Sequence, residues 1–214
     1  MNQILYSKHD NVINNSKKKQ KKFKLLLYIS IFSIFCVLFY FLYSFYSRNK
    51  KEEFSKKLLN NFNLEQLYSD NKDYVTVELN SSGTFFVIGI VEIPKINIKY
   101  PILSHTNDEL LKIAPCKFFG SYPNQEGNMC IAGHNYDDDR FFSNLYKLNI
   151  GDFVNIYDSK NNLINYEIYE KFETYESDIS CTSQNTDGRK EITLVTCNNI
   201  NNNRLIIKAK EAKK

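Results

Sequence analysis

A cysteine and an arginine stand at the two ends of one turn in the last quarter of the chain. Residues 191–210 read EITLVTCNNINNNRLIIKAK, in which two β-branched apolar runs, 192–195 and 205–207, flank an asparagine-rich turn at 198–203. This pattern predicts two antiparallel strands, which would bring Cys197 and Arg204 to the same end of a sheet. A cation beside a thiol favours the thiolate, the nucleophilic form. The alternative is an inert core cysteine beside an unrelated surface arginine.

Acid–base chemistry at such a thiol needs a histidine, and the chain has three. His9 lies in the polar N-terminal arm. His105 lies in ILSHTNDELL, where Thr106 is a natural helix N-cap, and we expect it to be a surface turn residue. His134 ends the run GNMCIAGHN, so a short apolar strand delivers its imidazole to a sheet end with space around Gly133. His134 is the candidate acid and base, although a single histidine in such a place is more often structural.

The other cysteines give no sign of a metal site. The five cysteines show no CxxC spacing, which argues against structural zinc: Cys36, Cys116, Cys130, Cys181 and Cys197. The last four allow three disulfide connectivities, and their spacing selects none of them. We expect free thiols and no metal or organic cofactor.

The positive charge is concentrated at one place. A dense block precedes the first apolar run and consists of Lys17, Lys18, Lys19, Lys21, Lys22 and Lys24. Without it, the net charge of +4 falls close to neutral, so we expect no nucleic acid as a partner of the folded part. A chain of 214 residues with 43% hydrophobic residues can bury one good core with an appendage.

The segment 25–46 predicts a membrane anchor. Its 22 residues carry no charge, and a helix of that length reaches about 33 Å, enough for roughly 30 Å of hydrocarbon. The lysine block precedes it, whereas the cations that follow are diluted by Glu52 and Glu53. The positive-inside rule therefore puts the N-terminus in the cytoplasm and the bulk of the chain outside. A cleaved signal peptide is the alternative, but no small-residue cleavage site follows the span.

The sequence divides into four parts. Residues 1–24 read as a disordered basic cytoplasmic arm and 25–46 as the transmembrane anchor. Residues 47–83 read as a helical stalk followed by a linker, because apolar residues recur loosely at helical spacing before the Asn- and Ser-containing stretch 71–80. Residues 84–214 read as the extracellular catalytic domain.

The sequence pattern of residues 84–214 is typical of an all-β domain. Seven short β-rich runs are separated by turn residues, at about 84–94, 96–103, 128–133, 152–158, 163–175, 191–197 and 204–210. One helical segment at 107–113 and one helical turn at 141–148 interrupt them. Many short strands with few helices predict a small barrel or sandwich.

Taken together, IAGHN, TLVTC and the downstream arginine resemble the sortases, membrane-anchored cysteine transpeptidases of Gram-positive bacteria. The resemblance covers about residues 89–209, including IPKINIKYPI, TNDELL and FSNLYKLNIGD. It implies a closed eight-stranded β-barrel. It also implies Cys197 as nucleophile, His134 as general acid and base, and Arg204 as the residue that stabilises the oxyanion.

The same resemblance implies the reaction and the partners. A secreted protein with a C-terminal LPXTG-like signal is cut between Thr and Gly, and an amine of the peptidoglycan precursor, lipid II, resolves the thioacyl enzyme. No cofactor is implied. Some relatives bind calcium, but the consecutive acids 137–139 read as a solvated loop.

Subclass and activity stay open on sequence. The 15 residues 176–190 are too few for the long helix of class B, and no DPW-like lid of class C precedes the barrel, which leaves a class A-like or D-like enzyme. Cys181 is unexpected in this loop and either lies near the active site or packs there. A cysteine hydrolase that releases its product to water uses the same residues, and a catalytically idle binding module is the third alternative.

Overall fold

The computed structural model describes residues 2–68, 75–79, 83–198 and 203–212. The chain falls into two compact units, residues 1–50 and 51–214. Each unit is described by itself.

The first unit is entirely helical. Helix α1 (Asn2–Tyr68) provides all of it and continues into the second unit. It contains a stretch long and apolar enough to cross a membrane. The expectation of disorder in the basic arm is wrong for residues 2–22, which are helical. Lysine is a good helix former, and extending an existing helix costs far less than nucleating one.

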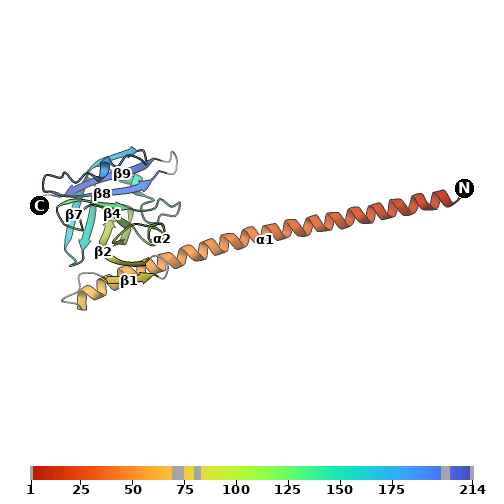
Figure 1. Cartoon of the computed structure of the whole chain (residues 1–214), viewed down its shortest axis with the longest axis horizontal. Coiled ribbons are helices and arrows are strands. Elements are labelled where there is room, and N and C mark those ends of the chain that lie inside the picture. The colour runs from red at the N-terminus through yellow and green to blue at the C-terminus, as the bar shows by residue number, and fades with distance from the viewer. Residues whose placement is uncertain (1, 69–74, 80–82, 199–202, 213–214) are drawn as a thin grey trace. The chain divides into compact units, whose positions relative to one another are not determined.

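In the described part of the second unit, nine strands form one sheet (Figure 1). They are β1 (Val75–Leu79), β2 (Gly83–Ile93), β3 (Ile98–Leu103), β4 (Cys116–Phe119), β5 (Gly127–Ala132), β6 (Phe153–Asp158), β7 (Leu163–Thr174), β8 (Lys190–Cys197) and β9 (Arg204–Glu211). Their order in the sheet is β1-β2-β3-β4-β5-β8-β9-β7-β6.

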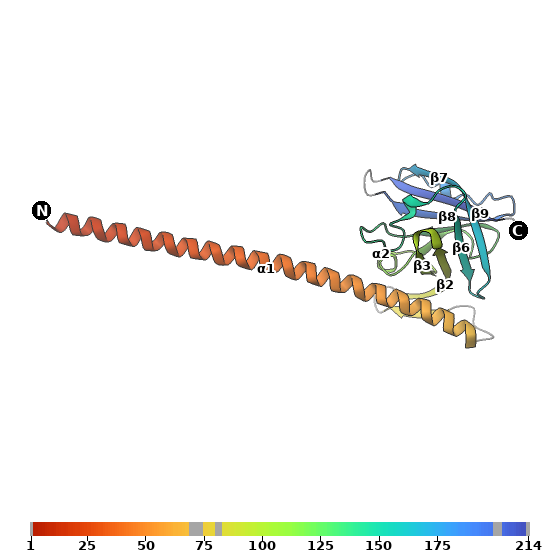
Figure 2. The same ribbon diagram turned by 180° about the vertical axis from the view of Figure 1, so that it is seen from behind.

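An additional pairing closes this sheet into a barrel. Strand β2 pairs with β6, so the eight strands from β2 to β9 form a ring, and β1 pairs with β2 alone. Register shifts interrupt the pairings β2–β3, β4–β5 and β7–β9, and such bulges bend strands and increase twist. The predicted closed eight-stranded barrel is confirmed. Figure 2 shows the ring from behind, with β7, β8 and β9 side by side.

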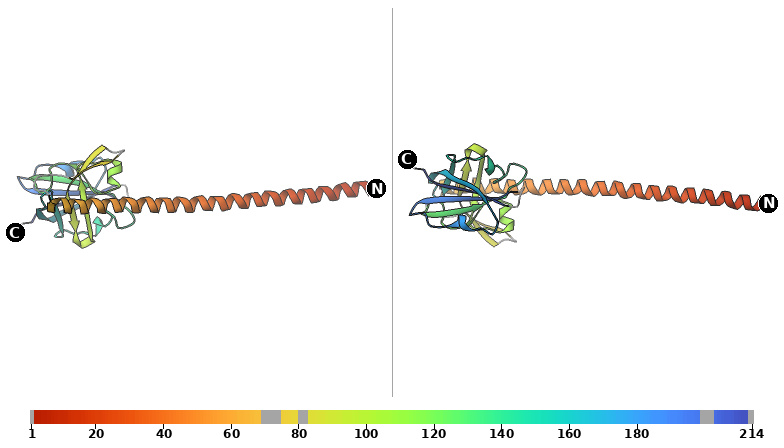
Figure 3. Two further views of the ribbon diagram at one scale, coloured as in Figure 1. Left: turned by 90° about the horizontal axis from the view of Figure 1, so that it is seen from below. Right: turned by 90° about the horizontal axis from the view of Figure 1, so that it is seen from above.

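Two large cores and one small cluster around Cys181 hold the described part of the second unit together. The larger core gathers residues from most strands of the ring, among them Ile102, Ile131, Tyr166 and Leu194. The smaller core joins Leu58 and Phe62 of α1 to residues of β2 and β3 and to Leu110 of helix α2 (Asp108–Leu111). The C-terminal turns of α1, which lie in the stretch expected to be a helical stalk, therefore pack on the barrel. The two views of Figure 3 show these turns against one side of the barrel.

The sequence did not predict every element. Strand β1 occupies part of the stretch read as a linker, whose residues 71–74 and 80 lie outside the described part. Strand β4 was not expected. The predicted helix at 107–113 exists, but its N-cap is Asn107, whose side chain accepts hydrogen bonds from the backbone amides of Glu109 and Leu110. The expected turn at 141–148 contains the 3₁₀ helix η2 (Leu145–Lys147).

Candidate active site

Cys197 and Arg204 end two neighbouring strands. Strands β8 and β9 are antiparallel, and Cys197 is the register partner of Arg204. Nη1 of Arg204 donates to Sγ of Cys197 at 4.0 Å. The Cys197 side chain is exposed, whereas the preceding strand residues 191–196 are buried. A thiol on the rim of a rigid strand beside a guanidinium is therefore accessible to a large substrate. Residues 199–202 of the predicted turn lie outside the described part.

His134 reaches the same end of the barrel from the other side of β8. Strand β5 is the parallel neighbour of β8, with Ala132 opposite Val195. The pairing continues past the strand ends, because the Gly133 amide donates to the Val195 carbonyl at 3.1 Å. Two residues beyond Ala132 and two beyond Val195 are His134 and Cys197, so parallel register brings both to one rim.

Gly133 is needed beneath the histidine. A Cβ atom at position 133 would lie 2.6 Å from Cδ2 of Phe142, a distance that requires the ring to move. The Gly133 carbonyl also accepts a hydrogen bond from the Thr196 hydroxyl at 2.7 Å. The absence of a side chain at Gly133 thus leaves room for the Phe142 ring directly before His134.

The imidazole of His134 is half-buried among aromatic and charged groups. Its ring lies 5.0 Å from the Tyr136 ring, centroid to centroid. Burial lowers its pKa below the ordinary value, the charges of Lys112 and Arg140 lower it further, and Asp108 opposes them. The neutral imidazole is therefore the favoured form at neutral pH. The exposed His105 only contacts the neighbouring Ser104 hydroxyl, at 3.1 Å, as expected for a surface turn residue.

Two further side chains at this rim were not predicted from the sequence. Glu176 forms an ion pair with Nη2 of Arg204, and it can do so because Thr174, two residues earlier, is the register partner of Arg204 on β7. Asn135 donates from Nδ2 to the Cys197 carbonyl at 2.7 Å. Asn135 follows His134 directly, so GHN could have indicated it, whereas nothing in the loop sequence singled out Glu176.

A cavity of about 540 Å³ opens beside Cys197. Its lining includes the nucleophile candidate, residues of the loop after His134, and side chains of β7, and three of its lining residues are acidic: Asp137, Asp139 and Glu173. Among the described residues, no group of three or more His, Cys, Asp or Glu side chains is arranged to hold a metal ion.

The other thiols of the barrel are buried. Burial raises the pKa of Cys116 to about 12 and that of Cys130 to about 12, so both stay protonated and unreactive at neutral pH. Burial also raises the pKa of Cys181, which packs with Val195 and Ile206. The open question about Cys181 is resolved in favour of packing. All five cysteines are free.

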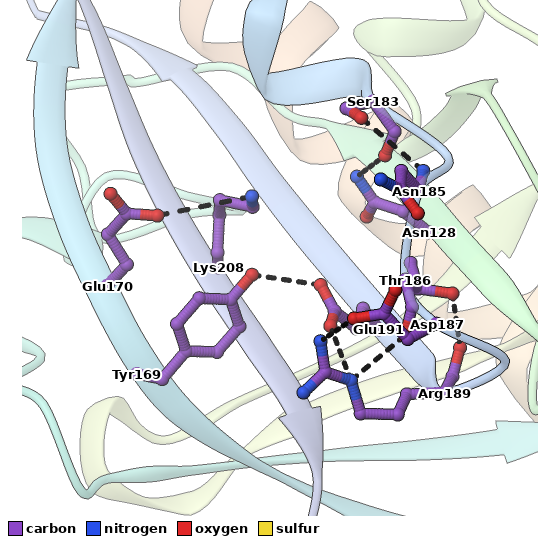
Figure 4. A network of polar contacts seen from close by, with 10 residues as sticks. All are labelled: Asn128, Tyr169, Glu170, Ser183, Asn185, Thr186, Asp187, Arg189, Glu191 and Lys208. Carbon is purple, nitrogen blue, oxygen red and sulfur yellow. Dashed lines mark hydrogen bonds and ion pairs between the residues drawn. The ribbon is translucent and has the colours of Figure 1, made fainter.

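The loop between β7 and β8 is anchored at its second half (Figure 4). The Asn128 amide on β5 donates to the carbonyls of Cys181 and Ser183 at 3.0 and 3.1 Å. Closer to β8, Glu191 accepts from Tyr169 at 2.9 Å and pairs with Arg189 at 3.4 Å. The loop contains only the 3₁₀ helix η3 (Ser180–Thr182), in keeping with the expected absence of a long helix. Its first half, which carries Glu176, faces Arg204.

Comparison with known proteins identifies the family. A family model described as a sortase domain matches residues 91–212, which is more than half of the 214 residues. Sortase A of Bacillus anthracis is 28% identical over 138 residues, covering 63% of this chain and 63% of that protein. The chain thus spans less than two thirds of that relative's length.

Solved structures agree with this match. A sortase D5 transpeptidase of Clostridium perfringens superposes with a TM-score of 0.61 and 30% identity, covering 74% of this chain and 98% of that one. A Clostridium perfringens sortase C, solved with the C-terminal cell wall sorting motif, superposes with a TM-score of 0.54 and 23% identity, covering 74% and 87%. The second match concerns the fold alone. Given the matching family model and the closed eight-stranded barrel, this chain belongs to the sortase family.

Proposed function

We propose that this protein is a membrane-anchored cysteine transpeptidase. It cleaves a C-terminal LPXTG-like sorting signal of secreted proteins and transfers the acyl group to an amine of a peptidoglycan precursor. The observation that carries the proposal is the contact between Nη1 of Arg204 and Sγ of Cys197, at 4.0 Å, with His134 at the end of the adjacent parallel strand. In the proposal, Cys197 is the nucleophile, His134 the general acid and base, and Arg204 the oxyanion donor.

The first half-reaction forms a thioester. The Cys197 thiolate attacks the carbonyl carbon of the Thr–Gly bond, and the electron pair of the C=O bond moves to oxygen. Arg204 donates to that oxyanion, for which a planar and permanently charged guanidinium is well suited. The proton that the Cys197 thiol loses passes to His134, and when the C–N bond breaks this imidazolium gives it to the leaving amine. The products are the Cys197 thioester and the free tail.

The second half-reaction transfers the acyl group. Neutral His134 takes a proton from the acceptor ammonium, and the free amine attacks the thioester carbonyl. The attacking nitrogen loses its second surplus proton to water as the tetrahedral intermediate collapses, the C–S bond breaks to release the Cys197 thiolate, and a new amide bond remains. The low pKa that burial gives His134 supports this step, because the histidine must act as a base here.

The cavity beside Cys197 supports an amine as the acceptor. Three of its lining residues are carboxylates, Asp137, Asp139 and Glu173, against one cation, Lys171. The Lys171 ammonium is also engaged, donating to the carbonyls of Tyr146 and Leu148 at 2.7 and 2.8 Å. A cationic ligand entering this cavity meets a favourable local potential.

A hydrolase is the second candidate, because the exposed Cys197 leaves a thioester open to water as well as to an amine.

The proposed location of the protein follows from its membrane anchor. Residues 25–46 cross the membrane, residues 1–24 stay in the cytoplasm, and the domain 84–214 acts outside the cell.

The test is product analysis with the full-length protein in detergent. A panel of LPXTG-like peptides is incubated with and without a small primary amine. We expect Thr–Gly cleavage by the wild type, a peptide–amine conjugate when the amine is present, and no product from Cys197→Ala. Free acid as the sole product at saturating amine favours the hydrolase. Cleavage of no peptide by the wild type, or continued cleavage by Cys197→Ala, overturns the proposal.

A further inference from the structure

The loop after His134 is held in an unfavourable backbone conformation. An isolated bridge pairs Asn135 with Phe141, and the Phe142 amide donates to the His134 carbonyl at 3.1 Å, so the loop closes on the histidine itself. Within it, Asp139 and Phe141 have positive φ angles of 60° and 51°. For residues other than glycine this left-handed backbone conformation costs free energy, and it persists only where surrounding contacts stabilise it.

Arg140 lies between these two strained residues and connects them to the histidine. Its guanidinium carbon lies 4.4 Å from the centroid of the Tyr136 ring, and that ring lies 5.0 Å from the His134 ring. Nη2 of Arg140 pairs with Asp138 at 2.8 Å. A displacement of Arg140 is therefore expected to shift the Tyr136 ring, which contacts the His134 imidazole.

The contacts that support this loop come from Tyr100, which in turn contacts α1. Tyr100 on β3 donates to Oε1 of Glu52 at 3.2 Å, and the Tyr100 hydroxyl accepts from the backbone amide of Phe141. The rings of Tyr100 and Phe141 also meet edge to face, 5.0 Å apart. The Tyr100 side chain thus connects Glu52 with Phe141, one of the two loop residues with a positive φ angle.

The charge of Glu52 also acts directly on the loop. Burial lowers the pKa of Arg140, but the hydrogen bond and charge of Asp138, the charge of Tyr136 and the charge of Glu52 raise it above its ordinary value. Oε2 of Glu52 is buried and accepts no hydrogen bond within the part of the chain that the structure describes. The residue as a whole is half-buried, and its Oε1 atom also pairs with Lys56 at 3.8 Å, so the charge of Glu52 adds to that of Asp138 around Arg140.

We propose that Glu52 is a positioning residue for His134, acting through Tyr100 and Arg140 on the loop that carries the imidazole. Glu52 lies only a few residues beyond the apolar stretch 25–46 of the same helix. The helix that anchors the protein thereby forms part of the support of its active site. This inference rests on the proposed role of His134 as the acid that protonates the leaving amine.

The test compares two leaving groups in the full-length protein in detergent. One substrate is the LPXTG-like peptide with its Thr–Gly amide, and the other carries a thioester at the same bond. A thiolate leaves without a proton, so only the amide substrate depends on a well-placed acid. His134→Ala provides the reference for complete loss of that acid.

Glu52→Ala is expected to lower kcat on the amide about 10- to 100-fold, the range typical of a misplaced catalytic group, and to change kcat on the thioester by less than about threefold. Glu52→Gln keeps an acceptor for Tyr100 but removes the charge, and its loss should be intermediate. The matched control is Glu53→Ala at the exposed neighbouring position, which should change neither rate. In an Arg140→Met background, Glu52→Ala should cost much less than in the wild type, because both act through one chain of contacts.

The outcomes separate the two proposals. If Glu52→Ala slows both substrates equally, or neither, Glu52 only stabilises the fold or does nothing, and the inference is overturned while the proposed function stands. Full additivity of Glu52→Ala and Arg140→Met overturns it as well. If His134→Ala itself shows no selective loss on the amide, the assignment of the acid in the proposed function fails.

Discussion

At the scale of single residues, the two terminal nitrogens of Arg204 make different contacts. Nη1 faces the sulfur of Cys197 and Nη2 pairs with Glu176. In the proposed mechanism, the ion pair orients the guanidinium plane and leaves Nη1 able to donate to an oxyanion formed next to the thiol. A planar fork can make both contacts at once, and an ammonium group cannot.

This division of contacts predicts the behaviour of two Arg204 variants. Arg204→Ala should lower kcat/KM about 10²–10³-fold, or roughly 3–4 kcal/mol, as the loss of one oxyanion donor does. Arg204→Lys keeps the charge but loses the fork, so it should recover little of that loss. The measurement is kcat/KM on one peptide, together with the rate of Cys197 alkylation. Near wild-type turnover of the lysine variant would mean that Arg204 acts on the thiol by charge alone.

The burial of His134 predicts a pH dependence of stability. Its pKa is lowered in the folded protein, so the unfolded chain binds the proton more readily once the pH falls to the ordinary histidine range near about 6.5. The stability associated with neutral His134 is therefore present above that range and is lost as the pH falls through it. Glu92 and Asp152, whose pKa values are also lowered, contribute only at more acidic pH.

Thermal unfolding at about pH 7.5 and about pH 5.5 measures this effect. The wild type should lose part of its Tm over this interval, and His134→Gln should lose less. The exposed His105 provides the control, since His105→Gln should follow the wild type. An identical decrease in Tm for His134→Gln and the wild type would show that the imidazole does not resist protonation.

The sequence predicted a site of three residues, which the structure brings to one rim of the barrel, but it did not predict their neighbours. Cys197 ends β8, Arg204 begins β9 and His134 lies two residues beyond the end of β5, so the register of these strands brings the three residues to one rim. Glu176 lies in an irregular loop, and its contact with Arg204 depends on how β7 pairs with β9. Contacts of this kind depend on tertiary structure, and no local pattern encodes them.

At the scale of elements, the same distinction explains which strands were found. Long runs such as β2 and β8 contain enough β-branched residues to be recognised. Strand β4 has four residues with two of them exposed, and β1 has five next to a stretch rich in Asn and Ser. Short segments without a strong apolar pattern form strands only because partner strands are present.

For helix α1, the apolar pattern predicted the helix but not the surface on which it packs. Its residues at helical spacing were read as a stalk, yet Leu58 is 2% exposed and Phe62 is 1% exposed. They pack on Phe85 and Val87 of β2 in the smaller core. Periodicity identified the helix, but it could not show that the barrel supplies a complementary surface.

This packing predicts that the helix contributes to the stability of the barrel. Leu58→Ala should lower the free energy of unfolding by about 2–5 kcal/mol, because it leaves a cavity in a closed core. Lys57→Ala at the exposed neighbouring position should change it by less than about 0.5 kcal/mol. Urea unfolding of the full-length protein in detergent measures both. Equal stability of the two variants would show that the packing of α1 on the barrel does not stabilise the fold.

At the scale of the whole molecule, the lysine block determines the predicted topology. With the basic block before the span, the domain after residue 52 should lie outside the cell. Protease added to intact protoplasts should digest that domain and leave an N-terminal tag protected. A cytoplasmic domain would instead be protected until the cells are lysed.

The central claim is that Cys197 carries the acyl group. The most direct measurement is the intact mass of the full-length protein after incubation with an LPXTG-like peptide in the absence of amine, followed by mapping of the modified residue. We predict a mass increase equal to the peptide up to and including threonine, located on Cys197 and removed when an amine is added. Cys181→Ala should retain this adduct, because Cys181 is buried, and Cys197→Ala should lack it. An adduct on another residue, or cleavage of the peptide without any covalent intermediate on Cys197, would contradict the account.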